Sequence, residues 1–230
     1  MKHIVLFGKS GSGKDFLTKK LSEIYRNRMK RFAFADDVKK HIQILLNIPE
    51  TDFCRFLHDE DYKNHTLVDV SNMRIEVVAD VEHKNPNWEN IVDAKTLDDR
   101  NLEYSDFNTE RIFMSLREFT VFYGTNVIQK HLGRKTWCNT IFNSKEYVDA
   151  RQNGLVVITD CRFPHEYEEC KNQGFYFVEV VSSEKPDFEV HNIAESYYST
   201  FKCDYTFHNN KKDDDVFHTE LLKFLKWLGQ

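Results

Sequence analysis

The sequence has few cysteines, no excess of basic residues and no long apolar run. The five cysteines of the 230-residue chain are odd in number and widely spread, and no two form a C-x-x-C pair. This usage argues against a disulfide framework or a zinc site and favours reduced thiols in the cytoplasm. The apolar stretch Ile4–Phe7 is too short for a signal peptide, and no run approaches the roughly 18 residues of a membrane span. We therefore expect a cytoplasmic protein without a membrane partner.

The net charge of the chain limits the kinds of ligand that we expect it to bind. The net charge of −5 argues against a broad basic face that grips polymeric nucleic acid. A small phosphate-rich ligand remains possible, because a few Lys and Arg side chains can gather in one cleft. Apolar residues make up 40% and charged residues 30% of the chain, which is typical of a globular protein with a real core.

Hydrophobic periodicity predicts an α/β fold with a mostly parallel sheet, because short apolar runs alternate with helical patterns. The expected strands are His3–Phe7, Arg31–Ala35, Leu155–Thr159, Phe175–Val181 and Asp204–Phe207. The expected helices are Lys14–Met29, Asp36–Leu46, Thr51–Tyr62, Glu110–Tyr123, a restart at Asn126–Leu132, Thr136–Ala150, Pro164–Asn172 and Asp213–Leu228.

The segment Asn64–Phe107 differs from the rest, since it is polar and holds one marked β run, Met73–Val78. We interpret residues 64–107 as an inserted flap, and residues 1–63 and 108–230 as the core domain.

A phosphate-binding loop is the most specific motif. Gly8–Lys14 fits the pattern G-x-x-x-x-G-K, with a strand before it and an amphipathic helix after it. Glycines let backbone N–H groups face anionic oxygens at the helix N-terminus, and Lys14 reaches the β- and γ-phosphates of a nucleotide. The residues expected to hold the nucleotide here are Gly8, Ser10, Gly11, Ser12, Gly13, Lys14 and Asp15. Asp15 stands where Ser or Thr is usual, and its carboxylate can hold Mg²⁺ or face the acceptor.

A second acidic site follows a buried strand. Asp160 comes directly after Leu155–Thr159, at the edge where open α/β sheets bind ligands, and can serve metal or acceptor. Arg162 has forked donors suited to phosphate, and Glu166 is a weaker candidate on the next helix. The alternative is that Asp160 only caps that helix.

A looser set lies in the middle of the chain: Arg117, Gly124, Thr125 and Trp137. Gly124-Thr125 is expected to break a helix, and the N–H groups of the restarted helix could receive an anion. Each residue alone has a structural alternative, with Gly124 as a helix stop and Trp137 as a core side chain.

These pieces, taken in order, resemble the phage-type deoxynucleoside monophosphate kinases. The shared residues are Gly8–Asp15, Phe34-Ala35-Asp36 with Lys39, Arg117, Gly124-Thr125, Trp137, Asp160, Arg162, Glu166, His191, Glu195 and Asn209. The resemblance implies a P-loop kinase-like three-layer α/β/α fold, transfer of the ATP γ-phosphate to a deoxynucleoside monophosphate (dNMP) with Mg²⁺, and a homodimer, in the host cytoplasm if the gene is from a phage.

The resemblance also implies roles. Ser12, Lys14, Asp15 and Asn209 would serve ATP, and Asp15 and Asp160 the metal. The acceptor residues would be Asp36, Lys39, Arg117, Gly124, Thr125, Trp137, Asp160, Arg162 and Glu166. Lys14, Asp15, Arg117, Asp160 and Arg162 would be catalytic. Related enzymes often have a second basic residue where this chain has Glu118, and Gln where it has Val121. Both would touch the acceptor nucleotide, so the accepted base is left open.

Three alternatives stay open. Animal-type phosphomevalonate kinases share the Gly-rich loop with Lys-Asp and an Asp-x-Arg after a strand. A GTP-dependent switch is suggested by Asn210–Asp213, which fits N-K-x-D, but Asp160 lacks the glycine such a switch needs three residues on. A regulatory nucleotide-binding protein without turnover is the third.

Overall fold

The computed structural model describes residues 2–70, 74–77, 90–93, 113–182, 197–210 and 214–229, with only the backbone given for 74–77, 90–93 and 214. The chain forms two compact units. The first contains Met1–Phe34 and Cys138–Gln230, and the second contains Ala35–Trp137.

The first unit is built on a five-stranded sheet with the order β2-β7-β1-β8-β9. The strands are β1 (Ile4–Phe7), β2 (Met29–Phe32), β7 (Leu155–Ile158), β8 (Tyr176–Ser182) and β9 (Tyr205–Asn209). All neighbouring pairs run parallel. Every residue of β1 and β7 is buried, which explains their unbroken apolar sequences, because helices cover both faces of a parallel sheet.

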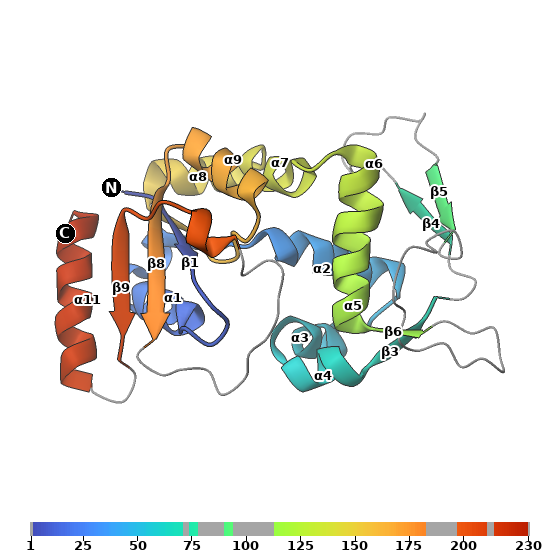
Figure 1. Ribbon diagram of the computed structural model, residues 1–230, viewed down its shortest axis with the longest axis horizontal. Coiled ribbons are helices and arrows are strands. Elements are labelled where there is room, and N and C mark those ends of the chain that lie inside the picture. Colours follow the sequence, from blue (N-terminus) through green and yellow to red (C-terminus); the bar gives the residue numbers. More distant parts are fainter. Residues whose placement is uncertain are drawn as a thin grey trace. The chain divides into compact units, whose positions relative to one another are not determined.

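Helices cover the two faces of this sheet. On one face, Ile4 and Leu6 pack in a core with buried side chains of α1 (Lys14–Tyr25) and α11 (Asp214–Leu228). Figure 1 shows α11 beside β9. On the other face, Phe177 stacks near Tyr167 of α9 (Pro164–Asn172), with α8 (Lys145–Asn153) and α7 (Thr136–Phe142) alongside. The predicted three-layer α/β/α architecture with a parallel sheet is confirmed.

The second unit is mainly helical. It contains α2 (Phe34–Leu45), α3 (Glu50–His58), α4 (Glu60–His65), α5 (Leu116–Val121), a π-helix η3 (Phe122–Gln129) and α6 (Lys130–Leu132). Two short antiparallel pairs complete it: β3 (Leu67–Asp69) with β6 (Phe113–Ser115), and β4 (Arg74–Val77) with β5 (Asn90–Asp93). The β run predicted at 73–78 is confirmed by β4.

The start of the chain corrects one predicted helix and one predicted strand. The helix expected over 14–29 ends at Tyr25, because Arg26 turns to a positive φ of 51°. A 3-10 turn, η1 (Arg26–Arg28), then leads into β2 at Met29. The strand expected over 31–35 therefore begins and ends earlier, and Phe34 already belongs to α2.

Three further predictions from helical periodicity are wrong in part. Residues 113–115 of the helix expected over 110–123 form a strand, since β6 pairs with β3. The break expected at Gly124-Thr125 is a continuous π-helix. The single helix expected over 136–150 is two, because the Ser144 side chain accepts a hydrogen bond from the Tyr147 N–H and starts α8 anew.

The inserted flap predicted at 64–107 lies mostly outside the described residues and stays a prediction. Within the part of the chain that the structure describes, no helix is long and apolar enough to cross a membrane. A last 3-10 turn, η4 (Tyr198–Thr200), precedes β9.

Candidate functional site: the phosphate loop and its neighbours

The predicted phosphate loop joins the carboxyl end of β1 to the first turn of α1. Gly8, Gly11 and Gly13 all have positive φ, at 138°, 74° and 96°. A Cβ on Gly8 would overlap the Val180 carbonyl oxygen of β8, so only glycine allows this close approach. No side-chain hydrogen bond caps the start of α1. The amide N–H groups of its first turn therefore remain available to an anion, as at other anion-binding helix N-termini.

The far end of the sheet holds this loop in place. Asn209, the last residue of β9, donates a hydrogen bond from Nδ2 to the Ser12 carbonyl oxygen at 2.8 Å. Asn209 is 1% exposed and Ser12 is 3% exposed. Asn209 Oδ1 and Ser12 Oγ are both buried, and neither has a hydrogen-bond partner among the described residues. Asn209, predicted as a nucleotide ligand, thus contacts the loop backbone.

Lys14 lies at the centre of the loop. Its ammonium group donates to the carbonyl oxygens of Gly8 at 2.7 Å and Lys9 at 2.9 Å, so the loop curls around the positive charge. Asp15 follows in the first turn of α1 and is exposed, as is Ser10 in the loop. An ammonium beside uncapped amides and an accessible carboxylate form a setting suited to phosphate and a hard cation.

Asp160 and Arg162 follow β7, the parallel neighbour of β1, so they leave the sheet at the same edge as the loop. Asp160 is half-buried, and its Oδ1 accepts a hydrogen bond from the Phe34 N–H at 2.8 Å. Asp160 therefore fixes the start of α2 rather than the cap of α9. Arg162 is exposed, and its backbone N–H donates to Glu166.

Glu166 is buried, and its carboxylate binds the backbone of the turn formed by residues 160–163. Its Oε2 accepts the N–H groups of Arg162 at 2.7 Å and Phe163 at 3.0 Å. Burial and the nearby Asp160 charge raise the pKa of Glu166 to about 8, although these hydrogen bonds and Arg162 work in the opposite direction. The carboxyl group is 5% exposed, and its contacts are with the turn that presents Arg162.

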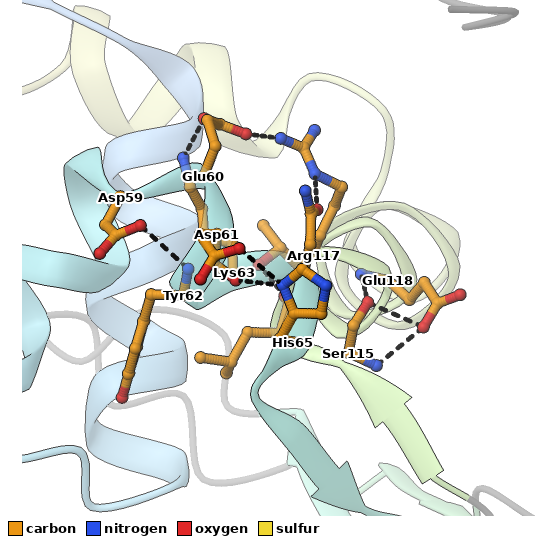
Figure 2. Close-up of polar contacts among 12 residues, drawn as sticks. Asp59, Glu60, Asp61, Tyr62, Lys63, His65, Ser115, Arg117 and Glu118 are labelled. Atoms are coloured by element: carbon orange, nitrogen blue, oxygen red, sulfur yellow. Dashed lines mark hydrogen bonds and ion pairs between the residues drawn. The ribbon is translucent and has the colours of Figure 1, made fainter.

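In the second unit, Arg117 lies in the first turn of α5, against α4, as Figure 2 shows. Its Nε donates to Asn64 Oδ1 at 2.7 Å, and its guanidinium forms an ion pair with Glu60. The Glu60 carboxylate also pairs with Lys63, which is buried. Sequence reasoning missed Glu60, Lys63 and Asn64, because a pairing across more than fifty residues leaves no local signal.

Glu118, expected to touch the acceptor, forms a capping box with Ser115 (Figure 2). Its Oε2 accepts from the Ser115 N–H at 2.7 Å and from Ser115 Oγ at 2.8 Å, and the Glu118 N–H donates back to Ser115 Oγ at 3.2 Å. The pattern S-x-x-E is a known helix start, so this local signal was present in the sequence. Glu118 therefore anchors the helix that carries Arg117.

The π-helix contains Gly124 and Thr125. The Trp137 indole N–H donates to the Gly124 carbonyl oxygen at 3.0 Å, and the ring is 3% exposed beside His41. A Cβ on Gly124 would lie 3.2 Å from Val38 Cγ1, so glycine lets α2 approach closely. The Thr125 hydroxyl lies within hydrogen-bond distance of two acceptors, the Val121 carbonyl oxygen and Asn126 Oδ1. In this structure Trp137 is a packing residue, and stacking on a base would require the ring to be uncovered.

The structure describes only some of the remaining predicted residues. Asp36 and Lys39 are half-buried on α2. His191, Glu195 and Asp213 lie outside the described residues, so the predictions that depend on them stay untested. No group of three or more His, Cys, Asp or Glu among the described side chains could hold a metal by itself.

One comparison with known proteins identifies the chain. A protein-family model described as deoxynucleotide monophosphate kinase matches residues 2–219. No curated protein matches the chain. The family match spans both the phosphate loop and the α5 region with Arg117. The chain therefore belongs to the deoxynucleotide monophosphate kinase family of ATP-dependent phosphotransferases.

Proposed function

We propose that this deoxynucleotide monophosphate kinase binds ATP with Mg²⁺ at the Gly8–Asp15 loop and passes the γ-phosphate to a dNMP bound by Arg117, Asp160 and Arg162. The observation that carries the proposal is the geometry of the loop. Three glycines with positive φ, an uncapped helix start and the Lys14 ammonium lie in one short segment.

The loop residues have distinct parts in ATP binding. The backbone from Ser10 to Lys14 would receive phosphate oxygens, and the Lys14 ammonium would leave the Gly8 and Lys9 carbonyl oxygens for the β- and γ-phosphates. The Ser12 hydroxyl is buried and has no partner in the part of the chain that the structure describes, so it can donate to a phosphate oxygen.

Mg²⁺ fits the side chains that are present. It prefers oxygen ligands and usually takes one or two carboxylates, with substrate phosphates and water completing the shell. In this proposal Asp15 and Asp160 would supply those carboxylates, Asp15 from the first turn of α1 and Asp160 from just beyond the end of β7. When bound, the ion neutralises charge that builds on the phosphates.

The acceptor residues follow from the same chemistry. Arg117 and Arg162 are exposed guanidinium groups that can bind phosphate with paired donors. Asp36, Lys39 and Thr125 remain proposed acceptor contacts. Glu166, Gly124 and Trp137 would support the acceptor residues through the contacts described above.

The reaction needs positioning and charge neutralisation more than a base. An oxygen of the acceptor phosphate attacks the γ-phosphorus, and the bond from that phosphorus to the β–γ bridging oxygen breaks. Because the acceptor phosphate is already largely ionised near neutral pH, no side chain has to remove a proton. Lys14 and the two arginines would stabilise the transferring group.

An ATP-coupled assay tests the proposal against dAMP, dCMP, dGMP, dTMP, the ribonucleotides and phosphomevalonate. We expect turnover with one or more dNMPs and a loss of about 100- to 1,000-fold in Lys14→Ala. Lys20→Ala is the matched control, because Lys20 is half-buried on the same helix and pairs only with Glu23 in the described ion pairs. Near-normal activity in Lys14→Ala would overturn the proposed role of the loop.

We further propose a cytoplasmic homodimer, encoded by a phage. All five cysteines are free, which supports a reducing compartment. Sedimentation analysis at several protein concentrations decides the oligomeric state, and a monomer at all concentrations would contradict the dimer.

A further inference from the structure

A single carboxylate joins two cations in the second unit. Glu60 Oε2 pairs with the Arg117 guanidinium, and Glu60 Oε1 pairs with the Lys63 ammonium. Figure 2 shows the Glu60 carboxylate directed at Arg117. The two oxygens of one anionic group therefore each meet a different positive charge.

The members of this arrangement differ in their exposure and in their other contacts. Lys63 is 9% exposed, so little of the residue reaches solvent. Arg117 also donates a hydrogen bond from Nε to Asn64 Oδ1. The Glu60 side chain is 61% exposed. Glu60 can therefore turn into solvent while Arg117 keeps its hydrogen bond to Asn64 and Lys63 stays enclosed.

We propose that Lys63 and Arg117 form a binding site for the acceptor's phosphate, and that the Glu60 carboxylate competes for this site as an internal substitute. The proposal rests on the proposed function of Arg117. It adds Lys63 as a phosphate ligand, Glu60 as a competitor and Asn64 as a positioning residue.

The chemistry of the two anions favours exchange. Arginine binds carboxylate and phosphate with the same paired geometry. A nucleoside monophosphate carries about −1.5 to −2 charge near neutral pH, against −1 for Glu60. Exposed ion pairs are weak, so Glu60 is easily displaced, yet its carboxylate offsets part of the Lys63 charge until the phosphate arrives.

If Glu60 competes with the phosphate, and if it instead orients Arg117, the Glu60→Gln substitution has opposite effects on dNMP binding. If Glu60 competes, Glu60→Gln tightens dNMP binding by roughly two- to five-fold, the size of one exposed ion pair. If Glu60 instead orients Arg117, the same variant weakens binding. Asp61→Asn is the matched control, because it removes the same charge from the adjacent exposed residue of α4, where Asp61 pairs with His65.

Binding is measured by calorimetry for dAMP, dCMP, dGMP and dTMP without ATP, with inorganic phosphate as the smallest probe. We expect tighter dNMP and phosphate binding in Glu60→Gln, no change in Asp61→Asn, and about ten-fold weaker binding in Lys63→Met. Asn64→Ala should raise the KM for dNMP while leaving the KM for ATP unchanged, and Asn64→Gln, which keeps the acceptor oxygen, should restore part of the loss.

The variants distinguish a failure of this inference from a failure of the proposed function. If Arg117→Gln leaves dNMP binding unchanged, the acceptor role of Arg117 is wrong and the inference fails with it. If Arg117→Gln weakens binding but Glu60→Gln weakens it too or leaves it unchanged, the acceptor role stands and the competition alone is overturned. Thermal unfolding of Lys63→Met shows whether the buried position tolerates the change, and Lys63→Arg provides a second variant that keeps the charge.

Discussion

The side-chain amide of Asn209 donates to the backbone carbonyl oxygen of Ser12 at 2.8 Å, across a separation of 197 residues. The bond ties the end of the last strand to the middle of the phosphate loop. Both residues are buried, so water cannot easily replace the contact. The last strand therefore contributes to the loop whose sequence is complete within the first fifteen residues.

Asn209→Ala should weaken ATP binding through the loop. The variant leaves the Ser12 carbonyl oxygen without its donor, which costs about 1–3 kcal/mol and loosens the loop. We expect a higher KM for ATP and an unchanged KM for dNMP in steady-state kinetics. His208→Ala changes the exposed preceding residue of the same strand and serves as the control. Equal effects of Asn209→Ala on both substrates would contradict the loop-specific role.

Gly8→Ala should destabilise the protein more than an ordinary glycine substitution. The added Cβ would meet the Val180 carbonyl oxygen, and φ of 138° is already unfavourable for alanine. Gly133 supplies the comparison, because it has φ of 102° and open space around the added atom. We expect Gly133→Ala to lose about 1–2 kcal/mol in urea unfolding and Gly8→Ala to lose clearly more. Similar losses would show that β8 moves aside at Gly8.

Stability should depend on pH through Glu166. Because the folded pKa of about 8 lies above the ordinary 4.5, the folded protein holds a proton that the unfolded chain has released between these values. The contribution of this group is complete below pH 4.5 and is lost as the pH rises through about 8. Glutamine does not titrate there, so wild type should lose stability relative to Glu166→Gln with increasing pH, by up to about 1.4 kcal/mol per unit.

Urea unfolding of both proteins from pH 5 to pH 9 measures this slope, with Glu168→Gln as an exposed control on the same helix. A flat difference between wild type and Glu166→Gln would contradict the raised pKa. The same pH-dependent difference between wild type and Glu168→Gln would show that the effect is not specific to Glu166.

Trp137→Phe should reduce stability with little effect on the KM for dNMP. The variant removes the N–H donor to Gly124 and part of a buried ring, a loss of about 1–3 kcal/mol. Kinetics measured well below the unfolding temperature separate packing from recognition. A raised KM for dNMP at unchanged stability would make Trp137 a stacking surface instead.

Local chemistry explains which predictions succeeded. The strand–glycine–lysine–helix pattern of residues 4–25 and the helix 164–172 with Pro164 at its start depend on neighbours in sequence, and the structure places both elements there. Predictions failed where a distant partner decided. Residues 113–115 fit the helical spacing of the apolar residues around them, yet they form β6 because β3 offers its backbone hydrogen bonds.

The contacts of the site residues show the same difference between local and distant partners. Nothing near Arg117 in the sequence indicates Glu60 or Asn64, and nothing near Asn209 indicates Ser12. The Ser115–Glu118 capping box was readable from four consecutive residues, but the resemblance to related enzymes drew attention to the acceptor instead.

By itself, the sequence determined the parallel α/β class and the phosphate loop, because periodicity and glycine spacing act through backbone geometry within a few residues. Only the tertiary structure decided that Asn209 holds this loop, that Glu166 is buried with a raised pKa, and that Glu60 joins Arg117 to Lys63. Burial and charge pairing depend on which distant segments meet in space, and the order of residues along a chain does not specify that by local rules.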